Sequence, residues 1–146
     1  MPLIATLTLN PAMDLSVSTA RVISTEKLRC SLPRHDPGGG GINVARVVKT
    51  LGGRAIAIYP AGGPFGDLLQ RSLDELGLVH RPVSITGDTR ESFTVDELGS
   101  GLQYRFVLPG PTLSAQELQR CLDSLAALQP TPAYVVLSGS FPPGVG

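Results

Sequence analysis

Three short runs of apolar and β-branched residues recur along the chain, at 3–9, 55–59 and 133–137. Each run is nearly continuous, whereas a strand with one wetted face would alternate apolar and polar residues. Segments of helical periodicity separate the runs. This order predicts a parallel sheet that is covered by helices on both faces.

Three segments predict those helices. The first, 42–51, is followed by Gly52 and Gly53, which are typical of a helix C-terminus, and its predicted apolar face consists of Val44, Val47, Val48 and Leu51. The second, 64–76, stops at Gly77. The third, 114–128, opens with Ser114 and Glu117 at the spacing of a capping box.

A second group of strands has the alternating pattern of a sheet with one wetted face. It consists of 15–22, 27–32 and 91–108, of which the last predicts a hairpin that turns at 99–101. We therefore predict an α/β fold, with a parallel sheet flanked by helices and a small β-sheet lid. The lid strands are expected near 15–33 and 90–108.

Composition and charge exclude several classes of protein. The 146 residues suffice for one domain with a hydrophobic core, and twelve Lys and Arg residues balance twelve Asp and Glu residues. This balance gives no electrostatic footprint for nucleic acid or an anionic membrane. There is no apolar stretch of transmembrane length and no signal peptide, so we expect a cytoplasmic protein. Cys30 and Cys121 are predicted to be free thiols.

Four consecutive glycines, 38–41, stand just before the first helix and raise the question of a ligand. Bare backbone lets a ligand approach closely, and a helix N-terminus offers free N–H groups. The run lacks the lysine of a phosphate-binding P-loop and the preceding apolar strand of a dinucleotide-binding fingerprint. A flexible linker is the alternative, although Pro37 stiffens the entry to the run.

Two polar residues near the strand ends point to a sugar. Asp14 follows the first core strand, and Asn43 lies in the first turn of the helix after the glycines. A carboxylate and an amide can each bind hydroxyl groups. For Asp14 alone, a turn or cap residue is the alternative, because "NPAMD" is turn-like.

Cations on the predicted lid suggest a phosphate group. Lys27 and Arg29 lie on the polar face of 27–32, Arg90 precedes one hairpin strand, and Arg105 lies within the other. Together they could converge on a phosphate, and solvated side chains on an exposed sheet face are the alternative. His35 and His80 show no partner pattern, and no metal cluster, carboxylate pair or nucleophile set is visible.

The last predicted strand lies close to the end of the sequence. The sequence stops soon after the predicted strand 133–137, before the crossover helix that would cover it. We therefore expect residues 1–146 to be the N-terminal part of one longer domain, with an apolar face or edge left bare.

Several motifs together resemble the N-terminal half of the ribokinase-like sugar kinases, and within them the phosphofructokinase B branch. The segments that carry the resemblance are "TLTLNPAMD", "KLRCSLPRHDPGGGGINVARVVKTLGG", "YPAGGPFGD", "TRESFTV", "QYRFVLPG" and "VVLSGSFPPGV". The resemblance implies a ribokinase-like core with a lid that closes over the sugar and clasps a second subunit. It also implies ATP with Mg²⁺ as the phosphoryl donor and a ketohexose phosphate, most often fructose 6-phosphate, as the acceptor.

The resemblance also assigns roles to residues. Asp14, Gly39, Gly40, Gly41 and Asn43 would hold sugar hydroxyls. The substrate phosphate would be bound by Lys27, Arg90, Arg105 and the loop around Gly139, with Lys27 reaching a neighbouring subunit's site.

The family's catalytic base belongs to a Gly-Ala-Gly-Asp motif that this sequence lacks, so the base is expected beyond Gly146 and the isolated chain is expected to be inactive. The ATP site is likewise expected mostly outside the chain. Two rival readings stay open, a non-catalytic module that binds a sugar phosphate and a family kinase with another acceptor.

Overall fold

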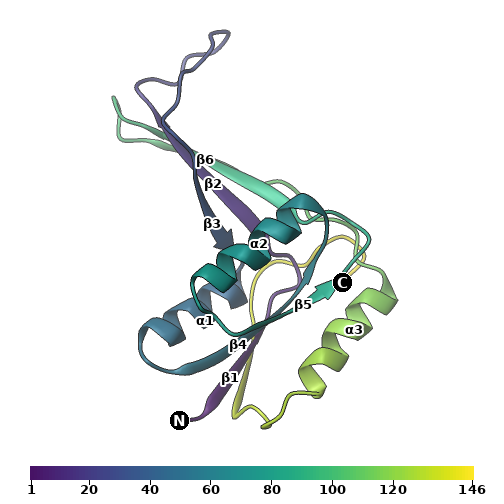
Figure 1. Ribbon diagram of the computed structural model, residues 1–146. Coiled ribbons are helices and arrows are strands. Elements are labelled where there is room, and N and C mark those ends of the chain that lie inside the picture. The colour runs from purple at the N-terminus through teal and green to yellow at the C-terminus, as the bar shows by residue number, and fades with distance from the viewer.

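The computed structural model describes residues 1–146 and divides them between two sheets (Figure 1). The larger sheet is wholly parallel, in the order β5 (His80–Ser84), β4 (Arg54–Ala61), β1 (Leu3–Leu7) and β8 (Tyr134–Leu137). Three helices accompany it, α1 (Gly40–Thr50), α2 (Gly63–Glu75) and α3 (Ala115–Ala126). The predicted parallel sheet and its three helices are confirmed.

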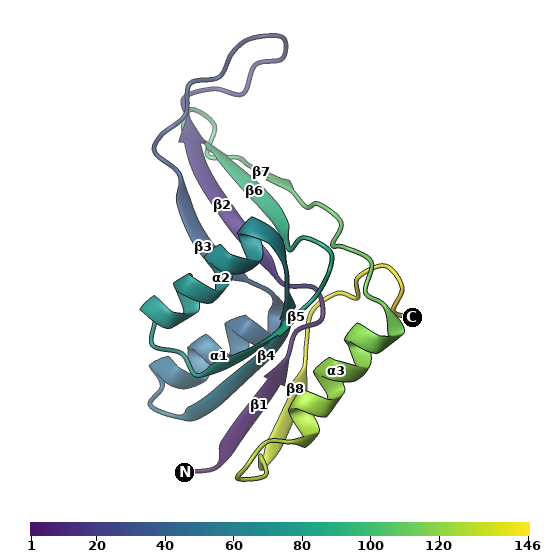
Figure 2. The same ribbon diagram turned by 45° about the vertical axis from the view of Figure 1, so that its right-hand side comes forward.

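The hydrophobic core lies on both faces of the parallel sheet. Helices α1 and α2 cover one face, where Ile42 and Leu69 pack with alternate residues of β4. Helix α3 covers the opposite face, where Cys121 packs against Ile58 (Figure 2). Because β4 is buried on both faces, its sequence shows no alternation.

The second sheet is the predicted lid, and it projects from one end of the parallel sheet (Figures 1 and 2). Its order is β3 (Arg34–Gly38), β2 (Ala12–Thr19), β6 (Arg90–Glu97) and β7 (Gln103–Phe106). Strands β2 and β6 run parallel, whereas the other two pairs are antiparallel. The loop 20–33 forms the tip of the lid.

The prediction of a strand at 27–32 is wrong. Those residues form part of the tip loop, and the strand that pairs with β2 is β3, at 34–38. Apolar alternation indicates a strand only where another surface covers the apolar side. Here Leu32 is 92% exposed. Strand β2 also begins at Ala12, so Asp14 lies on a strand and not in a loop.

Three further details differ from the sequence pattern. Strand β5 was not predicted, because Pro82 breaks its pattern; a proline is tolerated there on an edge strand. His80, for which the sequence shows no partner, bonds to the Tyr59 hydroxyl at 2.8 Å and to Asp74 at 2.9 Å, and its side chain is 9% exposed. In α1 the buried side chains are Ile42 and Ala45, and of the predicted apolar face Val48 packs against the core while Val47 and Leu51 are exposed.

Other local predictions are confirmed. Ser114 and Glu117 form the reciprocal capping box of α3, and Glu117 also accepts the Thr86 N–H at 2.8 Å. Both cysteines are free, Cys30 at the surface and Cys121 in the core.

No helix combines the length and hydropathy that a membrane span requires.

Candidate functional site

One face of the lid sheet is polar, and the strand register explains why. Asp14 lies directly opposite Asp36 on β3 and Ser92 on β6. In the next row Ser16 lies opposite Arg34 and Thr94, and Thr94 lies opposite Arg105 of β7. Opposed residues, and residues two apart on one strand, point to the same side of a sheet. We call these two rows the polar face.

A cavity of about 430 Å³ lies between the polar face and the start of α1. It opens at the carboxyl ends of the parallel strands, where sheets of this kind place their ligands. Six of the predicted site residues line it: Asp14, Gly39, Gly40, Asn43, Arg90 and Arg105. Residues that were predicted separately, from the glycine run and from the lid, therefore meet in one place.

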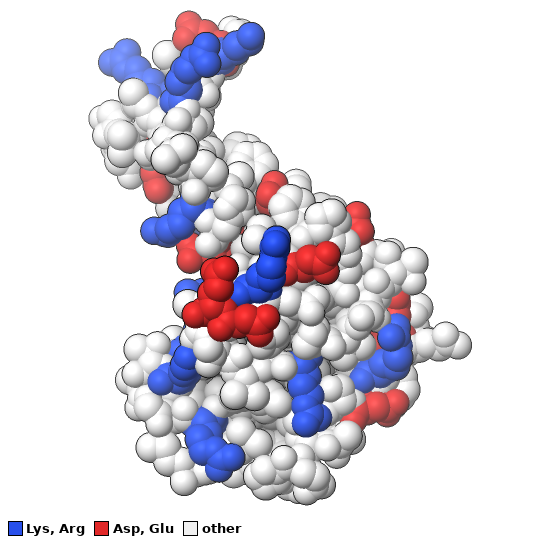
Figure 3. Space-filling model, viewed as in Figure 1, with Lys and Arg blue, Asp and Glu red and all other residues white.

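Three predicted residues lie outside this cavity. Lys27 is exposed in the tip loop, where Lys and Arg atoms gather at the end of the lid (Figure 3). Gly41 is buried, and its N–H donates to the Ser138 carbonyl at 3.2 Å. Gly139, with a φ of 114°, lies beside Gly40, so it borders the glycine run and not the cavity itself.

The four glycines are required mainly by contacts within the chain. A Cβ atom at Gly38 would lie 2.2 Å from Asp14 Oδ2, and one at Gly40 would lie 2.5 Å from Ser138 Oγ. A Cβ atom at Gly41 would lie 2.5 Å from Thr8 Oγ1. Gly39 has a φ of 125°, which only glycine adopts readily. Because the glycines have no side chains, β3 and α1 can pass close to β1 and β8.

The N-terminus of α1 offers fewer free donors than the glycine run suggested. The Ile42 N–H donates to Thr8 Oγ1 at 3.0 Å, and the Gly41 N–H is used by Ser138. Two of the first helical N–H groups are therefore satisfied by protein oxygens. The guanidinium groups across the cavity are therefore better donors for an anion than the N-terminus of α1.

Arg90 is held firmly at the base of the lid. Its Nη1 donates to the Leu108 carbonyl and its Nη2 to the Asn10 carbonyl, each at 2.9 Å, whereas its buried Nε has no partner. Burial lowers the pKa of Arg90, and the charge of Asp14 opposes that shift. Arg90 therefore ties the lid to the segment after β1 and keeps donors available at the cavity.

Asp14 is half-buried at the centre of the polar face. Burial raises its pKa, an effect opposed by the charges of Arg90, Arg105 and Arg46. The nearby charge of Asp36 acts in the same direction as burial. Burial and Asp36 therefore favour the neutral form of the Asp14 carboxyl, and the three arginines favour its charged form.

The sequence pattern missed Arg34, Asp36 and Ser92, although all three line the cavity. Arg34 Nε bonds to Asp36 Oδ2 at 2.8 Å, and Ser92 Oγ is buried without a partner. Placing the strand at 34–38 would have revealed Asp36, because it then lies opposite Asp14. A strand that contains proline, glycine and charged residues gives no such periodic signal.

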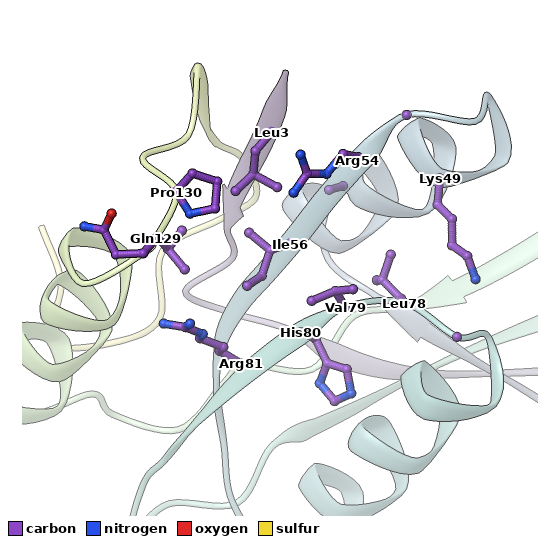
Figure 4. A pocket seen from close by; sticks show the side chains of 14 residues that line it. Leu3, Lys49, Arg54, Ile56, Leu78, Val79, His80, Arg81, Gln129 and Pro130 are labelled. Carbon is purple, nitrogen blue, oxygen red and sulfur yellow. The ribbon is translucent and has the colours of Figure 1, made fainter. Parts of the chain in front are cut away.

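A second cavity of about 430 Å³ lies at the opposite, amino-terminal ends of β1, β4 and β5 (Figure 4). Leu3 and Ile56 form part of its wall, with Arg54 and Arg81 nearby. His80 also lines it, and its ring bonds to Tyr59 and Asp74. Neither cavity contains a group of three or more His, Cys, Asp or Glu side chains that could hold a metal ion.

Comparison with known proteins gives one consistent family. The profile of the pfkB family carbohydrate kinases matches residues 7–146. The chain is 54% identical over 144 residues to the ATP-dependent 6-phosphofructokinase isozyme 2 of Mycobacterium tuberculosis (strain H37Rv), covering 99% of this chain and 42% of that protein. The chain thus spans less than half the length of this relative.

Solved structures agree with this match. Phosphofructokinase-2 from Escherichia coli in complex with fructose-6-phosphate superposes with a TM-score of 0.93 at 41% identity, over 100% of this chain and 48% of that chain. The tetrameric inhibited form of the same enzyme gives a TM-score of 0.92 at 42% identity, over 100% of this chain and 48% of that chain.

The electrostatics of Asp14 predict a gain of stability when its charge is removed. An acid whose pKa is raised by folding holds its proton more tightly in the folded state, so ionisation destabilises the fold. Asp14→Asn should therefore unfold at higher urea concentration than the wild type at pH 7. The difference should shrink as pH falls through the raised pKa and vanish below its ordinary value of 3.8. Asp123→Asn, on the exposed side of α3, is the control, and a less stable Asp14→Asn at pH 7 would contradict the account.

Proposed function

Because the chain belongs to the pfkB family of carbohydrate kinases, we propose that it is the acceptor-binding half of an ATP-dependent kinase that converts fructose 6-phosphate to fructose 1,6-bisphosphate. The observation that carries the proposal is the cavity that brings together Asp14, Asn43, Arg90 and Arg105. A sugar phosphate presents hydroxyls and a dianion together, and it therefore matches both kinds of group.

Within this proposal the two sides of the cavity have different tasks. Asp14 accepts hydrogen bonds from sugar hydroxyls, and the Asn43 amide both accepts and donates them. The bare backbone of Gly39 and Gly40 lets the ring approach α1 closely. Arg90 and Arg105 bind the phosphate. The loop around Gly139 packs against Gly40. Lys27, at the exposed tip, reaches the site of a second subunit.

The proposed contribution of this chain to catalysis is binding and orientation. Two arginines fix the phosphate end of the acceptor, so the hydroxyl at the other end is presented in one direction. The lid sheet lies over the sugar and excludes water, which would otherwise compete as acceptor. ATP with Mg²⁺ supplies the phosphoryl group, and the residues that hold them and the catalytic base belong mostly to the other half of the domain.

We also propose that two lids associate, in a cytoplasmic homodimer. Opposite the polar face, the register places Leu15 beside Phe93 and Phe106, and Val17 beside Val95 and Tyr104. Phe93 and Phe106 stack at 4.6 Å between ring centroids, yet Phe106 is 46% exposed. A second copy of the same apolar surface would bury these side chains.

The phosphate assignment predicts a selective loss of affinity. Arg105→Ala should weaken fructose 6-phosphate binding about 10- to 100-fold, since a hydrogen bond to a charged group contributes about 1.5–3 kcal/mol. Binding of unphosphorylated fructose should not change, because fructose lacks the dianion. Titration calorimetry with both sugars measures this, with Arg120→Ala on α3 as the control. Equal weakening of both sugars would count against a phosphate role for Arg105.

The kinase assignment is tested on the complete gene product. A coupled assay should show ATP-dependent turnover of fructose 6-phosphate and none with ATP omitted. Turnover only with fructose 1-phosphate or tagatose 6-phosphate would move the proposal to that acceptor. Binding of sugar phosphates without any turnover would instead support a non-catalytic binding module.

The lid association predicts a change of oligomeric state. Val17→Asp places a charge on the apolar surface of the lid and should convert dimers to monomers in sedimentation experiments at micromolar concentration. Val47→Asp, at an exposed position of α1 remote from the lid, should leave the dimer intact. Dimers that persist in Val17→Asp would exclude the lid as the interface.

A further inference from the structure

Two carboxylates face each other across the lid sheet. Asp14 on β2 and Asp36 on β3 are directly opposed, and both line the cavity. Like charges at opposed positions of neighbouring strands destabilise a sheet unless another group compensates them. The sheet therefore needs a specific reason to tolerate this pair.

Arg34 places an opposite charge directly beside Asp36. It lies two residues before Asp36 on the same strand, so both side chains lie on the polar face, and its Nε bonds to Asp36 Oδ2 at 2.8 Å. The Arg34 and Asp36 side chains are 77% and 37% exposed, and ion pairs this exposed add little to stability. The pair is better explained by its effect on its neighbour than by its effect on folding.

The other charged groups around Asp14 have different partners. Arg90 on β6 donates to the Asn10 and Leu108 carbonyls, and Arg46 on α1 donates to the Pro37 carbonyl at 3.1 Å. Arg105, on β7, forms no ion pair with a carboxylate of the chain. Arg34 is thus the only arginine bonded to a carboxylate in the cavity, and that carboxylate is Asp36 and not Asp14.

We propose that Arg34 and Asp36 form a positioning pair, in which Arg34 neutralises Asp36 so that Asp14 stays charged and available to the ligand beside it. Asp14 keeps its oxygens for the ligand, because no side chain of the protein bonds to it. The inference deepens the proposed function by adding two residues that control the sugar-binding carboxylate. Arg34 acts through Asp36, which distinguishes it from a residue that binds phosphate directly.

The pair makes a prediction about Asp14 that does not depend on any ligand. Without Arg34, the charge of Asp36 acts on Asp14 uncompensated and favours its protonated form. In Arg34→Leu, the titration midpoint of the Asp14 carboxyl should rise by about 0.5 pH units, the scale for a unit charge roughly 5–6 Å away under near-aqueous screening. In Asp36→Asn the midpoint should fall by a similar amount.

The double variant tests whether the two charges offset each other at Asp14. Because their effects on Asp14 have opposite sign and add, the Arg34→Leu/Asp36→Asn midpoint should lie between those of the two single variants, near the wild-type value. The midpoint is read from the ¹³C shift of the Asp14 carboxyl, assigned with Asp14→Asn, and Arg120→Leu is the matched control. Urea unfolding of each variant identifies loss of folding. An Asp14 midpoint that does not move in folded Arg34→Leu would overturn the proposal.

A second measurement connects the pair to the ligand and rests on the proposed function. Fructose 6-phosphate affinity of Arg34→Leu should be near the wild-type value at pH 8 and should fall on acidification at a higher pH than in the wild type. A uniform loss at every pH, with the Asp14 midpoint unchanged, would mean that Arg34 binds phosphate directly and would overturn the positioning role. If fructose 6-phosphate does not bind even to the wild type, the proposed function fails, while the carboxyl titration still decides the inference.

Discussion

The close passage of the glycine run beneath its neighbours is the constraint on which the site depends. At Gly38 the chain passes under the Asp14 carboxylate, at Gly40 it touches the loop after β8, and at Gly41 it lies against Thr8. A side chain at any of these positions would clash with the atoms that the glycine now touches. Because all of these contacts lie within a few residues, the lid strand β3 and the helix α1 are joined without a flexible linker. The cavity between them has a fixed shape at its base, where the glycines meet Asp14.

Charge on the polar face follows from the same close packing. Asp14 is pushed toward its neutral form by burial and by Asp36, and toward its charged form by three arginines. Arg90 pays a burial cost of its own and is held by two backbone carbonyls. These groups suit the guest that we propose, one that brings both hydroxyls and negative charge. The family match and this electrostatic arrangement therefore point in the same direction.

Periodicity predicted the parts of the fold whose burial is uniform along an element. The continuous apolar runs gave β1, β4 and β8, and the capping box located the start of α3. Periodicity failed where the pairing of a strand depends on partners distant in sequence. Strand β3 reads as a loop because "RHDPG" has no apolar face, yet β2 and the glycine contacts hold it in the sheet. Asp14, Arg90 and Arg105 were found from residue chemistry, whereas Asp36 required the register.

Mapping fructose 6-phosphate onto the chain by NMR is the most direct test of the central claim, that the polar face and the start of α1 form one sugar-phosphate site. The account predicts that saturable amide shifts concentrate at Asp14, Gly39, Gly40, Asn43 and the β6–β7 hairpin. Residues around the second cavity, such as Leu3 and Val79, should not respond. Shifts centred on that second cavity, or none up to millimolar sugar phosphate, would contradict the account.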